Sequence, residues 1–214
     1  MSVNQVYRLC YAKGEEAKYL SHLDTARMVE RAARRAGLPL AFSQGFRHRP
    51  LLSFGPPLPV GTSGEDEYLD LELREEVAAP EVGRRLGEML PSGVRVNGAW
   101  TVEKGGPSLI ILAGAASYRL DLVEGGSGEP RGREETEGVL SALREEKPSD
   151  LLAFSWHGGR EKVKLCLALR LGAKGLRPEA VAEVLAPDWR PAGICRTALY
   201  WNDGGRWRRI VTIR

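Results

Sequence analysis

The segment Phe42–Gly61, FSQGFRHRPLLSFGPPLPVG, holds the side chains of this sequence that are best suited to grip an anion. Arg47, His48 and Arg49 follow Phe46 and precede a proline-rich stretch. The planar guanidinium of arginine binds phosphate through two hydrogen bonds and stacks on bases. We therefore predict that Arg47 and Arg49 contact phosphate, and that Phe46 and His48 stack on or orient a base. The alternative is that the apolar residues of this loop only pin it to a sheet.

The charge of the chain is unevenly distributed, although its formal net charge is only +3. Residues 27–50 contain six arginines and one acidic residue, which gives +5, and residues 193–214 contain five arginines and one aspartate, which gives +4. Residues 65–81 contain eight acidic residues and one arginine, which gives −7. A basic face suits an anionic partner such as RNA. We expect the basic face to be extended by three arginines of a helix, Arg31, Arg34 and Arg35.

Catalytic signals are sparse in this sequence. It contains no GxSxG, GxxxxGK[ST] or GxGxxG motif, and its three histidines have no metal-ligand spacing, so we predict no metal site. His22, beside a helix start, and His48 are the candidates for general acid–base chemistry. The ordinary interpretation of His22 is a residue near a helix cap. The chain is therefore more readily interpreted as a binding protein than as an enzyme.

Cysteine usage indicates a reducing compartment. Cys10, Cys166 and Cys195 are an odd, widely spaced set, which favours free thiols over disulfides. Because no CxxC or CxxxCxxC motif is present, we expect no cofactor and no iron–sulfur cluster in this chain. No window approaches the length of a membrane span and no signal peptide is recognised, so we expect a cytoplasmic protein without membrane contact.

The candidate residues lie on elements with clear local signals. Ser21–Asp24 forms a capping box for a helix that runs to about Ala36, and Gly37 fits the position after its end. Further helices are predicted over 80–90, 134–146 and 178–185. Strands are predicted over 5–12, 40–43, 51–54, 67–73, 94–102, 117–123, 151–156, 162–171, 193–202 and 207–213.

The order of these elements predicts the fold class and the domains. Each half reads β-α-β-β-α-β, which is the ferredoxin-like pattern. We predict an α+β protein of two tandem ferredoxin-like (βαββαβ) units with antiparallel sheets. The first unit covers residues 1–104 and the second covers residues 115–214.

The stretch YLSHLDTARMVERAARRAGLPLAFSQGFRHRPLLSFGPPLPVGTSGEDEYLDLEL resembles the signature of the bacterial radical-SAM-linked protein family, over roughly Tyr7–Leu73. That family is a domain of unknown function that occurs beside, or fused to, radical-SAM enzymes. The usual loop of the family reads nearer to GFHPRP, so GFRHRP displaces the histidine by one position. The resemblance implies a radical-SAM protein as partner, and S-adenosylmethionine and an iron–sulfur cluster would be carried by that partner alone.

Three functional hypotheses follow from the sequence. The first is an RNA-binding accessory module that presents tRNA, rRNA or a ribonucleoprotein to a radical-SAM modifying enzyme. The second is a metal-independent endoribonuclease that uses a histidine. The third is a protein–protein scaffold for the radical-SAM partner, with the acidic residues 65–81 as its docking patch and no nucleic-acid binding.

Overall fold

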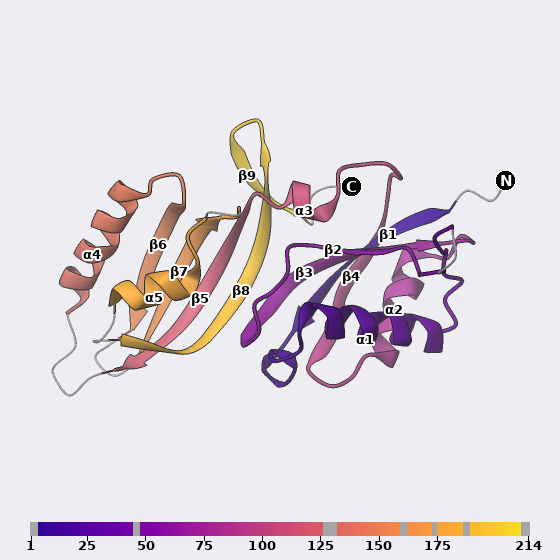
Figure 1. Ribbon diagram of the computed structural model, residues 1–214, viewed down its shortest axis with the longest axis horizontal. Helices are drawn as coiled ribbons and strands as arrows, with labels where there is room; N and C mark the ends of the chain where they lie inside the picture. The colour runs from indigo at the N-terminus through magenta and orange to yellow at the C-terminus, as the bar shows by residue number, and fades with distance from the viewer. Residues whose placement is uncertain are drawn as a thin grey trace. The chain divides into compact units, whose positions relative to one another are not determined.

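We describe the protein from a computed structural model, in which residues 4–44, 48–125, 132–158, 162–172, 175–185 and 189–210 are described. The chain divides into two compact units (Figure 1). Unit 1 comprises Met1–Ala113 and Arg208–Arg214, and unit 2 comprises Gly114–Trp207. Each unit combines strands with helices, and we describe each unit by itself.

The strands of unit 1 form an antiparallel arrangement centred on β1. β1 pairs with β3 on one side and with β4 on the other, and the short strand β2 pairs with β3. A 3₁₀ turn, Glu15–Ala17, and a four-residue helix, α3 (Leu109–Leu112), complete the unit. Its main elements are β1 (Gln5–Lys13), α1 (His22–Arg35), β2 (Leu52–Phe54), β3 (Thr62–Leu73), α2 (Ala79–Met89) and β4 (Val94–Val102).

Local signals fix both ends of α1. The Ser21 hydroxyl accepts a hydrogen bond from the Asp24 amide at 3.1 Å, and it donates to the Asp24 carboxylate at 2.6 Å. This confirms the predicted cap. Gly37 follows the helix end with a φ of 60°, a conformation that favours glycine. The predicted strand over 40–43 is wrong, because only isolated bridges form at Leu40 and Phe42, next to Pro39.

The main core of unit 1 lies between the strands and the helix pair. Tyr7 and Leu9 of β1 and Leu71 of β3 are fully or almost fully buried there. Val29 of α1 and Leu86 of α2 pack into the same cluster. Figure 1 shows α1 and α2 side by side against these strands. Burial of this apolar surface is the main favourable contribution to folding, at roughly 25 cal/mol per Å².

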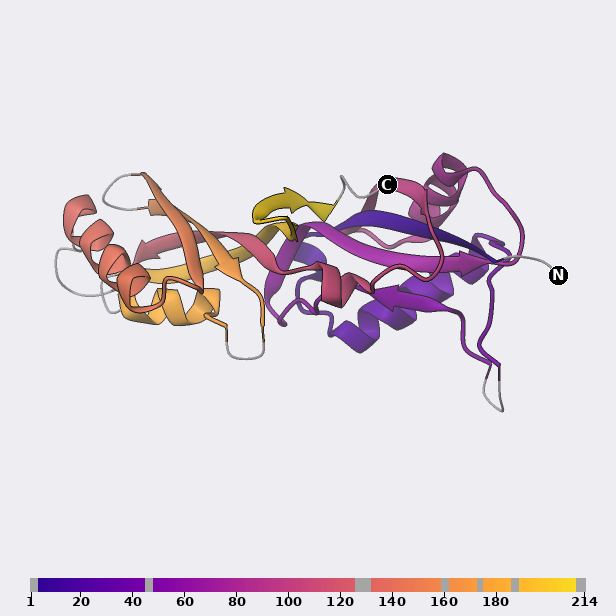
Figure 2. The same ribbon diagram turned by 90° about the horizontal axis from the view of Figure 1, so that it is seen from above.

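The strands of unit 2 are also antiparallel. β5 lies between β7 and β8, and β6 pairs with β7. Figure 2 shows α5 running along one side of β5 and β8. Turn glycines at 204 and 205, both with positive φ, lead from β8 into β9. The elements are β5 (Ala115–Glu124), α4 (Arg133–Glu146), β6 (Leu151–Gly158), β7 (Lys162–Arg170), α5 (Pro178–Leu185), β8 (Trp189–Asp203) and the start of β9 (Arg206–Arg209), whose last two residues belong to unit 1.

The strand pairs within each unit are antiparallel, but the prediction of two simple tandem ferredoxin-like units is wrong. A tandem requires two consecutive segments with four strands each. The described residues instead form nine strands, and unit 1 is completed by C-terminal residues that begin at Arg208. The strand order is therefore not a simple tandem ferredoxin-like arrangement. The error has a physical cause: residue patterns predict where strands form, whereas strand partners are chosen by contacts between segments distant in sequence.

Among the described residues, no helix is long and apolar enough to cross a membrane.

Candidate nucleic-acid interface

The outer face of α1 carries a row of arginines. Arg27, Arg31 and Arg34 are exposed and follow one another at spacings of four and three residues, which places them on one helix face. Thr25 and Val29 are buried on the opposite face. Of the three helix arginines predicted to bind RNA, the structure therefore places Arg31 and Arg34 in an exposed row on a rigid helix, together with Arg27.

Arg34 joins this row to the loop that follows the helix. Its guanidinium donates to the Glu30 carboxylate at 2.9 Å and lies over the ring of Phe42, 5.2 Å from the ring centroid. Such a cation–π contact is worth about 0.5–1 kcal/mol at an exposed site. The start of the loop is therefore held beside the last turn of α1.

Ser43 organises the described part of this loop. Its amide donates to the Arg49 carbonyl at 2.8 Å, and its hydroxyl accepts from the Arg49 amide at 3.1 Å. The Nδ1 atom of His48 lies 3.1 Å from the Ser43 carbonyl oxygen. His48 and Arg49 are both exposed. Phe46 and Arg47, the other two predicted binding residues of the loop, lie outside the described residues.

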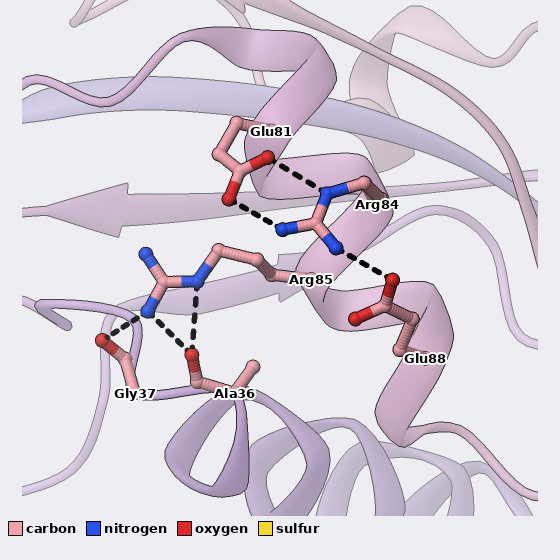
Figure 3. Close-up of polar contacts among 6 residues, drawn as sticks. All are labelled: Ala36, Gly37, Glu81, Arg84, Arg85 and Glu88. Carbon is pink, nitrogen blue, oxygen red and sulfur yellow. Dashed lines mark hydrogen bonds and ion pairs between the residues drawn. The ribbon is translucent and has the colours of Figure 1, made fainter.

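Arg35 has a structural task that its sequence position does not suggest. Its guanidinium donates to the Met89 carbonyl at the end of α2. In return, Arg85 of α2 donates to the carbonyls of Ala36 and Gly37 just after α1, at 3.0 and 2.7 Å (Figure 3). Each helix thus supplies a cation to the negative, carbonyl-bearing end of the other. Sequence reasoning missed Arg85, because the two arginines are far apart along the chain.

The two candidate histidines lie at opposite ends of α1. His22 is the first residue of the helix, and its ring meets the ring of Phe54 edge to face, with centroids 5.6 Å apart. His48 is bonded to Ser43, next to the Phe42 ring that contacts the last turn. A helix of fourteen residues is about 21 Å long. The two imidazoles are therefore too far apart to act together on one scissile bond.

At least four of the eight carboxylates of the acidic stretch 65–81 form ion pairs within unit 1. Its carboxylates face cations that come from other segments of the chain and from α2. The pairs are Asp66 with Arg209 at 3.5 Å, Asp70 with Arg8 at 2.8 Å, Glu72 with Lys104 at 2.9 Å and Glu81 with Arg84 at 2.7 Å. The same Arg84 also reaches Glu88 on its own helix (Figure 3). At least half of the acidic side chains are thus engaged in ion pairs, whereas Glu75 and Glu76 lie exposed between β3 and α2.

Arg8 and Asp70 lie at the centre of a second buried cluster, on the face of the unit 1 strands that α1 and α2 do not cover. Arg8 donates to both oxygens of the Asp70 carboxylate at 2.8 Å, and the two side chains are 5% and 14% exposed. A hollow of about 280 Å³ lies beside them. Because the charges of this pair satisfy each other, we assign it a structural role.

Cys10 belongs to the same cluster, and its thiol is expected to be unreactive. Burial raises the pKa of the Cys10 thiol to about 12, and the negative charge of Asp66 adds to the shift. Burial likewise raises the pKa of the neighbouring Tyr68 phenol. A thiol that stays protonated is neither a nucleophile nor a metal ligand. Within the described ranges, no group of three or more His, Cys, Asp or Glu residues could hold a metal ion.

Solved structures resemble this chain in fold. A chain of the archaeal box H/ACA sRNP Nop10–Cbf5 complex shares 11% identity, with a TM-score of 0.50 over 90% of this chain and 46% of that one. A chain of an H/ACA RNP bound to a substrate RNA containing 2′-deoxyuridine shares 10% identity, with a TM-score of 0.49 over 91% and 47%. The protein thus spans less than half the length of those chains.

Comparison of the sequence with protein families identifies one family. No curated protein matches the chain. The profile of a family described as "Uncharacterized protein conserved in bacteria (DUF2344)" matches residues 6–155. The match includes the arginine row of α1, the loop that follows it and the Arg8–Asp70 pair. Since it covers well over half of the sequence, the chain belongs to the DUF2344 family.

Proposed function

We propose that the protein is an RNA-binding accessory module that presents RNA to a modifying enzyme. The observation that carries the proposal is the continuity of the basic surface: Arg34 links the exposed arginine row of α1 to the loop of His48 and Arg49. Arginine side chains on a rigid helix, next to a loop, suit contacts to the phosphates of a folded RNA. The fold likeness to a chain of an archaeal H/ACA ribonucleoprotein is in keeping with this role.

The proposal assigns different tasks to the arginines. Arg31 and Arg49 are exposed and contact phosphate. Arg27 and Arg34 form ion pairs with Asp24 and Glu30, respectively, and these ion pairs break when the two arginines contact phosphate. Arg35 positions the helices through Met89. The radical-SAM protein remains the proposed partner, and it would supply the modification chemistry.

Binding of labelled tRNA and rRNA fragments at several salt concentrations tests the proposal. The variant Arg31→Gln/Arg49→Gln should bind more weakly than wild type. The slope of log K against log salt should fall by about two, because each phosphate contact contributes about one. A matched control, Arg84→Gln/Arg133→Gln, removes the same charge from exposed arginines of α2 and α4 and should bind like wild type. Equal binding by the two double variants would overturn the proposed surface.

A protein-docking role is the second candidate, and exposed apolar residues favour it. Tyr19, Leu23 and Val60 are 70%, 65% and 62% exposed. The segments of Tyr19 and Val60 are joined by a hydrogen bond of 3.0 Å from the Gly61 amide to the Lys18 carbonyl. A complex with a radical-SAM protein that survives nuclease treatment, together with no affinity for RNA, would select this role over the first.

A further inference from the structure

One face of the unit 2 strands is buried and carries leucines such as Leu120 of β5 and Leu165 of β7. The opposite face of these strands is open and basic. Along β7 the exposed or half-exposed positions alternate with buried ones, so Lys162 and Lys164 point away from buried Val163 and Leu165. Their cross-strand neighbours on the same face are Val123 and Asp121 of β5, and His157 of β6 stands opposite Lys164. Opposed side chains on one face lie about 5 Å apart at Cβ.

This open face carries a net positive charge. Arg119 of β5 and Arg190 of β8 lie at paired positions of the same face, in addition to the two lysines. Asp121 is an acid among them, and its carboxylate lies 3.8 Å from the Arg119 guanidinium. Lys162, Lys164 and Arg190 are exposed. Counted over the described residues of these strands, four cations against one carboxylate make the face complementary to a polyanion.

One end of the face is hollowed. A hollow of about 550 Å³ is lined by residues of β5, β6, β7 and β8, among them Asp121, Val123, His157, Gly158, Lys162 and Lys164. Its volume lies in the range of about 300–1,000 Å³ that is typical of ligand sites. Besides the Asp121 carboxylate, it combines apolar side chains, one imidazole ring and two ammonium groups. These are the elements needed to hold a flat base and its phosphate.

The backbone at this end is built so that the strands approach closely. Gly158 has a φ of 135°, and a Cβ at this position would stand 2.5 Å from the Lys162 carbonyl oxygen. A glycine is therefore required where β6 ends beside β7. The Nε2 atom of His157, the preceding residue, lies 3.0 Å from the Ser155 hydroxyl of the same strand, and His157 is the cross-strand neighbour of Lys164.

We propose that this hollow is a nucleotide site for single-stranded RNA, separate from the arginine surface of unit 1. Lys162 and Lys164 contact backbone phosphates, at positions about 7 Å apart along β7. One base lies in the hollow and stacks on His157, with Val123 against its other side. A flat strand surface accepts splayed, unpaired bases, whereas a duplex keeps its bases stacked inside. The inference extends the proposed function from folded RNA to a single-stranded segment.

The test measures binding of a labelled oligouridylate and of a blunt RNA duplex to the full chain. Lys162→Gln/Lys164→Gln should weaken oligouridylate binding about tenfold and lower its salt slope by about 1.4, because each contact to a single strand contributes about 0.7. Duplex binding should stay unchanged. The matched control is Arg144→Gln/Lys147→Gln, which removes two exposed cations from α4 and the residue after it. It should leave both affinities unchanged.

A second set of variants tests the stacked base. His157→Ala should weaken oligouridylate binding at least about fivefold, whereas His157→Phe should keep the wild-type affinity, because stacking on an aromatic ring tolerates that exchange. Far-UV circular dichroism confirms that each variant is folded. Wild-type oligouridylate affinity in the lysine variant, or an equal loss for the duplex, would overturn the inference.

The two proposals fail separately. Arg31→Gln/Arg49→Gln addresses unit 1, and Lys162→Gln/Lys164→Gln addresses unit 2. If only the first variant loses RNA, the arginine surface stands and the nucleotide site is wrong. If only the second variant loses RNA, the nucleotide site stands and the arginine surface is wrong.

Discussion

The two units differ most on the strand faces that their helices leave uncovered. In unit 1 this face is buried: Arg8 is 4% exposed and Tyr68 is 1% exposed. In unit 2 the corresponding face presents Lys162, Lys164 and His157 to solvent. Charged strand residues of the two units therefore lie in opposite environments. In unit 1 such a residue is half of a buried ion pair, and in unit 2 it is available to a ligand.

Several arginines of unit 1 are likewise engaged in contacts within the protein. Arg8 forms an ion pair with Asp70, and Arg35 donates to the Met89 carbonyl. Arg85 donates to the Ala36 carbonyl after the end of α1. A local excess of arginine in the sequence therefore overstates the surface that is available to RNA. The arginines that remain exposed on α1, such as Arg31, are the ones that the proposed function requires.

The largest expected effect comes from breaking the buried pair of unit 1. Asp70→Asn leaves the Arg8 guanidinium buried without a countercharge, which should lower the free energy of unfolding by about 3–5 kcal/mol. Urea denaturation measures this loss. The double variant Arg8→Met/Asp70→Leu should recover most of it, because apolar side chains replace both charges. A single variant as stable as wild type would show that this face is not sealed in solution.

Gly158→Ala tests the hairpin that shapes the open face of unit 2. The added methyl group meets the Lys162 carbonyl, and the positive φ is unfavourable for alanine, so we expect a loss of about 1–3 kcal/mol in urea denaturation. Gly138→Ala is the control, because that glycine lies in α4 with open space around its Cβ position. It should be neutral or stabilising. Equal stability of the two variants would contradict the assigned backbone constraint.

Arg84 and Arg85 are neighbours on α2 with different partners (Figure 3). Arg85→Gln removes charged hydrogen bonds to the end of α1, and we expect a loss of about 1.5–3 kcal/mol in the free energy of unfolding. Arg84→Gln breaks ion pairs only with Glu81 and Glu88 of its own exposed helix surface, so its effect should be much smaller. The reverse order in thermal denaturation would show that the helix junction is not held by these contacts.

The smallest effect concerns the thiols of the two faces. Burial and the charge of Asp66 raise the pKa of Cys10 to about 12, so its thiol should not react with a disulfide reagent at pH 8 in the native state. The half-exposed Cys166 of β7 should react first. Mass mapping of the labelled cysteines measures both. Modification of Cys10 ahead of Cys166 would contradict the burial of the unit 1 face.

The raised pKa of Cys10 also leads us to expect that the free energy of unfolding depends on pH. Its thiol holds its proton in the native state up to about pH 12, whereas an unfolded thiol loses it near pH 9. The native state therefore binds more protons between these values, and stability should fall as the pH rises above 9. Cys10→Ala should show a shallower decline between pH 8 and 10. Identical pH profiles would exclude this contribution.

The parts of the fold that could be predicted from the sequence are those that depend on local interactions. The hydroxyl of Ser21 and the positive φ of Gly37 delimit α1, and the strict alternation of residues 67–73 marks β3. Such signals depend on neighbours within a few residues, so they can be read directly. The predicted candidates Arg31, His48 and Arg49 accordingly lie on the helix and loop where the pattern placed them.

Long-range contacts decided what the sequence left open. Arg8 and Asp70 are 62 residues apart, and Arg35 and Met89 are 54 residues apart. Arg8 and Lys164 each stand between two apolar residues of a strand, yet Arg8 is buried and Lys164 is exposed. The return of the chain at Arg208 to unit 1 is of the same kind. Sequence periodicity determines which side chains share a face, and only tertiary packing determines whether that face is covered.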